Sequence, residues 1–112
     1  MSYDAGLVQR IEDLLATAGI RGARQKNVFG GRGFLLGKST FVIAWSDSLL
    51  VKMARDEYDA ALAEPNVTPF APDGEKPMST WLVVGSDTIA DDPELVVWLQ
   101  RGARGVTAGG RR

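Results

Sequence analysis

Residues 25–53 read QKNVFGGRGFLLGKSTFVIAWSDSLLVKM, and this stretch decides the fold. Its apolar residues recur with the period of two that β-strands require. Small or turn-forming residues interrupt the pattern at 30–31, 37–39 and 46–48. Strands joined by such short connections must be antiparallel, because a parallel crossover needs a dozen or more residues. The stretch therefore predicts a meander of four strands.

The third strand of this meander is apolar on both faces. Alternation predicts that Phe41, Ile43 and Trp45 point to one face of the sheet, and that Val42 and Ala44 point to the other. A strand that is buried on both faces belongs in the middle of a sheet. We therefore expect this strand to be central.

Amphipathic helices are predicted near both ends of the chain. Apolar residues recur at helical spacing over 4–18, and Gly19 is well placed to end that helix. The segment Asp92-Pro93-Glu94 has the features of a helix start, because carboxylates suit the free amide groups and the positive end of the helix dipole. We expect the last helix to run from Pro93 to about Arg104.

Two shorter elements are predicted between the meander and the last helix. Good helix formers over 56–64 predict a short helix that a proline stops. Further prolines make 65–77 an irregular connection, with Val67 and Phe70 as anchors in the core. A fifth strand is expected over 80–84.

Together these elements predict an α+β fold. It is a two-layer α/β sandwich, with a mostly antiparallel five-stranded sheet and three helices in the order α-β-β-β-β-α-β-α. The chain has 112 residues, the usual size of one domain. We expect a single domain over residues 1–104 and a flexible C-terminal tail over 105–112.

Composition argues against several classes of function. The formal net charge is -1, so there is no global positive field to attract nucleic acid or an anionic membrane. Cysteine and histidine are both absent, which removes thiolate nucleophiles, the commonest zinc ligands and the usual general base near neutral pH. No apolar run approaches the ~20 residues of a membrane span, and the N-terminus lacks the features of a signal peptide. We expect a cytoplasmic protein that is not an enzyme and that uses no cofactor, metal or membrane.

Four short motifs resemble those of a known family. Residues 27–37, NVFGGRGFLLG, resemble the M-F-G-G-x-x-F motif of TfoX N-terminal domains, with Val28 in the methionine position. Further similarity lies in LVKM at 50–53, MSTW at 78–81 and DPEL at 92–95. The resemblance covers about residues 4–104. It implies a bacterial setting and a fold like that of secretion chaperones, described as α-β3-α-β2-α; TfoX itself regulates competence and DNA uptake, and the family offers no catalytic residues to transfer.

The turn Gly30-Gly31-Arg32-Gly33 has two interpretations. Glycines let backbone amides approach a phosphate, and Arg32 would add positive charge. However, the spacing matches no phosphate-loop motif and the flanking segments are strands. A tight hairpin or bulge that needs positive φ is therefore favoured.

Charged and aromatic residues form three further groups. Basic residues around the first strands would form a basic face if those strands lie together, although the near-neutral charge favours an ordinary solvated surface. Carboxylates cluster at 56–59 and 87–94, where helix capping is favoured over a metal or acid–base site. Three tryptophans fall on predicted inward faces, which favours core packing over a ligand pocket or a partner surface. The residues concerned are Arg21, Arg24, Lys26, Arg32, Lys38, Arg101, Arg104, Arg111 and Arg112 for the basic group, and Trp45, Trp81 and Trp98 for the aromatic group.

Two hypotheses from different classes follow. The first is a non-catalytic regulatory or protein-interaction module that binds a protein partner and associates with itself as a homodimer. The alternative is a small-ligand or nucleic-acid-binding accessory protein that uses the Gly30–Gly33 turn and the nearby basic residues. The candidate interaction surface consists of Phe29, Gly30, Gly31, Arg32, Met78 and Trp81.

Overall fold

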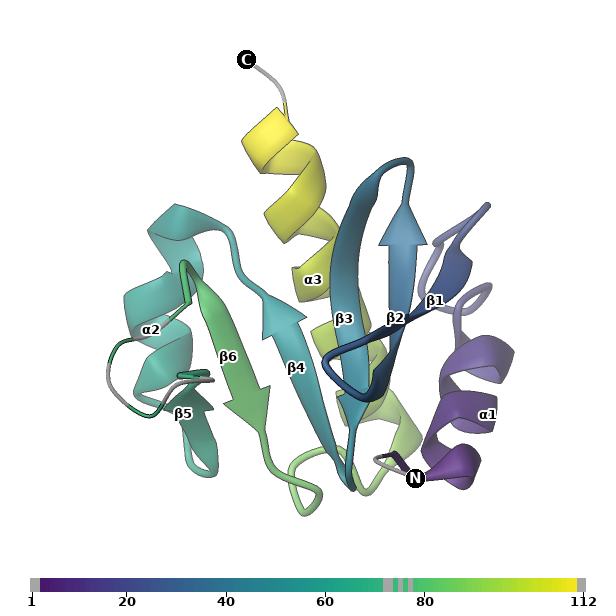
Figure 1. The fold of residues 1–112 in the computed structure, drawn as a ribbon, viewed down its shortest axis with the longest axis horizontal. Helices are drawn as coiled ribbons and strands as arrows, with labels where there is room; N and C mark the ends of the chain where they lie inside the picture. The colour runs from purple at the N-terminus through teal and green to yellow at the C-terminus, as the bar shows by residue number, and fades with distance from the viewer. Residues whose placement is uncertain (1–2, 72–73, 75, 77, 111–112) are drawn as a thin grey trace.

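The computed structural model describes residues 3–71, 74, 76 and 78–110 (Figure 1). Its helices are α1 (Ala5–Leu14), the 3-10 turn η1 (Arg55–Glu57), α2 (Tyr58–Leu62) and α3 (Asp92–Gly110). Its strands are β1 (Arg24–Val28), β2 (Gly31–Leu36), β3 (Ser39–Trp45), β4 (Ser48–Lys52), β5 (Val67–Pro69) and β6 (Trp81–Val84). In this described part of the chain, no helix has both the length and the hydropathy of a membrane span.

All the strands form one sheet in the order β1-β2-β3-β4-β6-β5, and every neighbouring pair is antiparallel. β3 lies in the interior of the sheet, as expected. The helix α3 packs across β3 and β4, and α1 lies beside α3. Figure 1 looks onto the other face of the sheet, with α3 behind the strands. The prediction of a two-layer α+β sandwich with an antiparallel sheet is confirmed.

The sheet has six strands rather than five, because part of the expected irregular connection pairs with β6. The strand β5 forms the edge of the sheet beyond β6. Asn66 has a φ of 63° just before it, and the Phe70 N–H continues the pairing by donating to the Trp81 carbonyl at 3.0 Å. Prolines concealed this strand in the sequence, but a proline is tolerated at a sheet edge, where its missing N–H breaks no ladder. Val67 and Phe70 are both buried, as predicted.

The expected alternation along β3 fails at Phe41. Ile43 and Trp45 belong to the cluster on one face of the sheet, whereas Phe41 lies with Val42 in the core beneath the helices. Opposite β2, Thr40 and Val42 pair with consecutive residues, so Phe41 between them is the extra residue of a β-bulge. A bulge resets the alternation, and the predicted face of Phe41 is therefore wrong.

The helix α3 is longer than expected at its C-terminal end. It continues to Gly110, so residues 105–110 of the expected flexible tail are helical, and 111–112 lie outside the described residues. Gly102 and Gly105 resemble helix-ending signals, because glycine is unfavourable in a helix interior. Both lie where α3 crosses the sheet, and a Cβ at position 102 would lie only 2.7 Å from a backbone carbonyl oxygen of β3. Close packing on the sheet thus accounts for both glycines.

The helix α1 is shorter than expected. Its regular turns end at Leu14, and residues 15–19 continue as hydrogen-bonded turns. Gly19, with a φ of 78°, closes this segment. At the other end, the Asp4 carboxylate accepts a hydrogen bond from the Gly6 N–H at 2.8 Å and so caps the helix.

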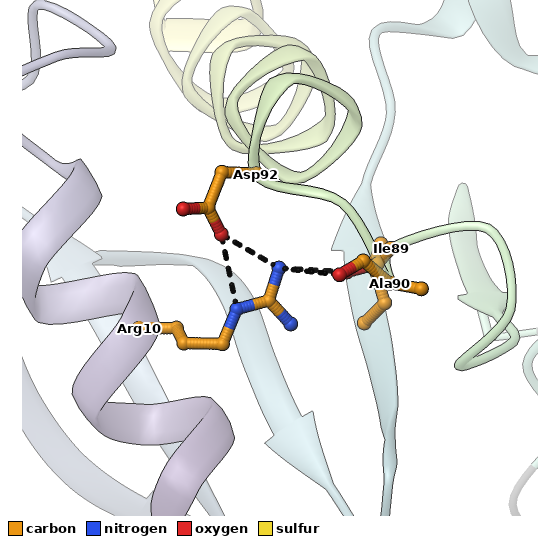
Figure 2. Close-up of polar contacts among 4 residues, drawn as sticks. All are labelled: Arg10, Ile89, Ala90 and Asp92. Atoms are coloured by element: carbon orange, nitrogen blue, oxygen red, sulfur yellow. Dashed lines mark hydrogen bonds and ion pairs between the residues drawn. The ribbon is translucent and has the colours of Figure 1, made fainter.

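One arginine ties α1 to the segment that enters α3. The guanidinium of Arg10 donates to one carboxylate oxygen of Asp92, from Nη2 at 2.9 Å and from Nε at 3.2 Å. The same Nη2 donates to the backbone carbonyls of Ile89 (2.9 Å) and Ala90 (3.2 Å). Figure 2 shows this arginine reaching from α1 to all three partners. Asp92 therefore holds the two helices together, in addition to favouring the start of α3.

The main core lies between the helices and the sheet. Each of the three α-helices contributes apolar side chains to it, and most of the rest come from the strands. Its largest fully buried members are Phe34, Phe41, Ile11, Leu49, Met53, Leu82, Ile89, Leu95, Leu99 and Val42. This core leaves the opposite face of the sheet available for a site.

Candidate functional site

The face of the sheet turned away from the main core is also apolar. Side chains that alternate away from the helices form a second cluster there. Its buried members are Ile43, Leu50, Phe70 and Trp81, with Val28, Trp45, Met78 and Val83 packed against them. We call the surface formed by these residues the open face.

The β1–β2 hairpin folds over part of the open face. Its central turn residues, Phe29 and Gly30, have φ values of 54° and 78°, and positive φ at both positions is the condition for the type I′ turn that suits twisted strands. A Cβ at Gly33 would lie 2.8 Å from a methyl group of Val28, so the missing side chain makes room for the hairpin. Figure 1 shows the turn of this hairpin crossing in front of β3. The glycine-rich motif therefore shapes the sheet.

Three aromatic rings contact one another in series on the open face. Phe29 meets Phe70 edge to face with ring centroids 5.5 Å apart, and Phe70 meets Trp45 in the same way at 5.5 Å. Phe70 is only 4% exposed, whereas Phe29 is 50% exposed. A left-handed backbone is rare for an aromatic residue and costs on the order of 1–3 kcal/mol. The chain thus holds a large apolar ring half in solvent, on an unfavourable backbone.

The rings border a pocket of about 430 Å³. It is lined by Phe29, Trp45, Pro69, Phe70, Ala71 and Val83. None of these described lining residues has an ionisable side chain, so a charged group that entered would find no ion-pair partner among them. The volume falls within the range of about 300–1,000 Å³ that is usual for ligand pockets. The pocket therefore suits one uncharged aromatic or aliphatic group.

Lys52 lies toward the other end of the open face and does not line the pocket. It pairs in register with Trp81, and its ammonium group donates to the Ser79 hydroxyl at 3.0 Å. Burial, and to a smaller extent the neighbouring Arg55, lowers the pKa of Lys52. Positive charge is therefore present on this face, but outside the aromatic site.

The structure brings together only part of the predicted interaction surface. Phe29, Met78 and Trp81 all lie on the open face. Arg32 does not, because it pairs in register with Ala44, whose side chain lies in the helix-side core. Gly30 and Gly31, the remaining members, form the turn and the start of β2. Alternation along β2 thus separates the arginine from the aromatic residues on either side of the sheet.

Two of the basic residues near the turn, Arg24 and Arg32, are engaged in contacts within the chain. Arg32 donates to the side-chain oxygen of Gln25 at 2.8 Å, and Gln25 donates to Glu12 of α1 at 2.6 Å. Arg24 donates to the backbone carbonyl of Gly37. These arginines brace the first strands against α1 and the next turn.

Two arginines near the C-terminus form ion pairs with the segment 55–64. Arg104 binds Glu57 through two hydrogen bonds, of 3.0 Å from Nε and 2.9 Å from Nη2. These bonds lower the pKa of Glu57 and raise that of Arg104. Arg101 binds Glu64 at 2.9 Å and lies 4.3 Å above the ring of Trp98. The expected capping role of the carboxylate at 57 is wrong, because it makes no cap hydrogen bond and binds α3 instead.

The remaining acidic residues assemble no recognisable centre in the described residues. Within that part of the chain, no group of three or more acidic side chains is arranged to hold a metal ion. Trp98 is buried in the main core and Trp81 in the open-face cluster, as the packing interpretation predicted. Trp45 differs, since it is half-buried and lines the pocket.

Sequence reasoning missed several walls of the pocket. Pro69, Ala71 and Val83 received no role, and Phe70 was expected only as a core anchor. In the sequence, only the motif around Phe29 indicated this region, because the motif covers the β1–β2 hairpin. Nothing in the sequence places Phe70 beneath Phe29, since the two meet only through the coiling of the hairpin over the sheet.

Comparison with family models connects this architecture to known proteins. The model of the TfoX N-terminal domain matches residues 13–105, which is most of the chain. The chain belongs to the TfoX N-terminal domain family. The match includes the β1–β2 hairpin, the described walls of the pocket, and Gly102 and Gly105 of α3. Membership of the TfoX N-terminal domain family indicates a regulatory or competence-related class of module. Comparisons with curated proteins and with solved structures gave no match.

Proposed function

We propose that this TfoX N-terminal domain is a non-catalytic regulatory module that binds protein through the pocket on its open face. The observation that carries the proposal is Phe29, half exposed on a backbone with a φ of 54°, at the rim of an apolar pocket. A conformation of this kind lowers stability, and such residues gather at sites of function. Aromatic side chains beside apolar pockets are typical anchors of protein interfaces.

The proposal includes the bacterial, cytoplasmic setting that the family and the lack of cysteine favour. The alternative of a small-ligand or nucleic-acid-binding accessory protein that uses the Gly30–Gly33 turn and the nearby basic residues gains no support from the contacts of Arg32. Arg32 faces away from the aromatic residues, and its guanidinium is already bound to Gln25. The glycines of the turn are accounted for by the fold of the hairpin.

Site-specific photo-cross-linking in the cell tests the proposal. A photoreactive phenylalanine analogue replaces Phe29 in the full chain, which is irradiated in cells of the source organism. Val97 is the matched control position, because it is an apolar side chain of similar exposure (45%) on α3. We expect a discrete protein adduct from position 29 that position 97 does not give. The lack of any adduct specific to position 29 would contradict the proposal.

A further inference from the structure

We infer that the occupant of the pocket is Phe29 of a second copy of this chain, so that two copies dock open face to open face about a two-fold axis. The inference rests on the proposed function and names the partner. Four observations support it: the apolar pocket, the exposed Phe29 beside it, the two sheet edges that disfavour pairing, and the small net charge.

The chain itself presents the kind of group that the pocket accepts. Among the described residues, the large hydrophobic side chains that are exposed are Phe29 and Val97. Val97 belongs to α3, on the other side of the sheet, whereas Phe29 stands at the rim of the pocket. A two-fold axis beside this rim brings each Phe29 to the pocket of the other copy at the same time. Such a contact is isologous and closes on itself as a dimer.

Docking in this way needs no rearrangement of the pocket. The Phe29 ring contacts Phe70, with ring centroids 5.5 Å apart, and the residue is 50% exposed. Its exposed part can therefore enter the second copy while the residue remains a wall of its own pocket. Each copy would bury its exposed aromatic ring and fill its apolar hollow in one step.

Both edges of the sheet are poor sites for self-association. On either side of β5, the Asn66 carbonyl and the Phe70 N–H form hydrogen bonds on the side of β6. By alternation, the backbone groups of Val67 and Pro69 point away from β6, to the free edge of the sheet. A second chain that paired there would find no N–H at Pro69. On β1, an antiparallel pairing centred on the strand would set Lys26 against Lys26 of the second copy. Face-to-face docking avoids both obstacles.

The net charge permits two copies to approach. With a formal charge of -1, the chain generates little repulsion against itself, and proteins near zero net charge associate more readily. The described residues that line the pocket carry no charged side chain, so a contact with them buries no ion.

A dilution series measured by sedimentation and light scattering tests the inference. The unmodified chain should change from dimer to monomer as it is diluted. Phe29→Asn should raise the dissociation constant roughly a thousandfold, because an anchor is worth about thirtyfold and the two-fold contact loses it twice. Asparagine tolerates the left-handed backbone at position 29, so this variant keeps the fold. Val97→Asn is the matched control and should leave the dissociation constant unchanged.

Disulfide trapping tests the geometry, and the chain has no cysteine to interfere. Differently tagged Phe29→Cys and Ala71→Cys chains are mixed under oxidising conditions, at a concentration well above the dissociation constant that remains when one of the two Phe29 contacts is lost. A mixed disulfide should form, and should exceed that from Val97→Cys mixed with Ala71→Cys. A monomer at every concentration, a dimer that Phe29→Asn does not weaken, or trapping no greater than the control would overturn the inference.

These results separate the inference from the proposed function. Photo-adducts at position 29 with a different protein, together with a monomeric chain, would overturn self-docking and leave the proposed function standing. Absence of any adduct at position 29 in a monomeric chain would overturn both.

Discussion

Gly105 in α3 lies so close to Lys52 in β4 that a Cβ at position 105 would overlap the Lys52 carbonyl oxygen. Within a helix, glycine is less favourable than alanine by about 1 kcal/mol. Here the missing side chain allows α3 to lie directly on the sheet. A tertiary contact therefore overrules the local helical preference at this position.

Gly105→Ala should lower the free energy of unfolding, although alanine is the better helix former. The added methyl group meets backbone rather than a flexible side chain, so α3 must shift, at a cost of roughly 1–3 kcal/mol or more. Urea unfolding followed by circular dichroism measures the change. The control is Thr107→Ala, at an exposed position of the same helix. This change should leave the free energy of unfolding nearly unchanged. A Gly105→Ala variant as stable as the original would contradict the observed helix–sheet distance.

Phe70→Ala and Phe29→Asn should affect stability very differently. Phe70 is 4% exposed and supports both neighbouring rings, so its truncation should cost about 3–5 kcal/mol. Phe29→Asn loses one edge-to-face contact, worth about 0.5–1.5 kcal/mol, but relieves a backbone that is unfavourable for an aromatic residue. Its net change should therefore stay within about 1 kcal/mol. Thermal unfolding at a concentration where the chain is monomeric compares the two, and equal losses would disprove the assignment of Phe70 as the buried member.

Glu57→Gln should reduce stability at neutral pH and have no effect in acid. The hydrogen bond from Arg104 lowers the pKa of Glu57 below its ordinary value of 4.5 in the folded state. A lowered pKa contributes stability above the unfolded value, and this is lost as the pH falls through the folded value. Because both side chains are partly exposed (34% and 53%), the effect at pH 7 should be on the order of 0.5 kcal/mol.

Urea unfolding at pH 7 and well below pH 4.5 measures this dependence. The control is Asp59→Asn, which removes the same charge from a neighbouring exposed carboxylate of α2. If the loss from Glu57→Gln persists unchanged in acid, the ion pair with Arg104 is not its cause.

Arg10→Ala should cost about 1–2 kcal/mol, because it leaves the backbone carbonyls of Ile89 and Ala90 without their charged donor. Asp92→Asn keeps the arginine and should cost less, since Asp92 is 63% exposed. Chemical unfolding of the two variants and of their double mutant gives the coupling energy. Equal losses for both single variants would show that the ion pair, and not the carbonyl contacts, holds α1 to the start of α3.

Much of the fold was predictable from local pattern. The meander from β1 to β4 follows from turn residues at short intervals, and antiparallel pairing follows from the length of the connections. The positive φ in the Gly30 turn was also expected. The strand β5 was not, because prolines argue against a strand unless it is known to lie at an edge, and edge position is a property of the whole sheet.

The candidate site was predictable only in part. The hairpin motif pointed to Phe29, and Trp81, the first residue of β6, is buried in the open-face cluster, where the sequence favoured core packing for it. Arg32 lies on the opposite side of the sheet from the aromatic residues, and the sequence does not say which side of β2 faces the helices. Phe41 was misassigned for a related reason, because a bulge depends on how two strands align rather than on either strand alone.

The sequence by itself determined most of the elements, their order and the antiparallel meander, because hydrophobic period and turn chemistry act between residues close along the chain. Only the tertiary structure decided where α3 ends, that β5 joins the sheet, and that the ring of Phe29 contacts that of Phe70. Those features depend on how closely a helix approaches a sheet and how far a hairpin coils across it. Such distances arise from contacts between residues remote in sequence, which no local pattern records.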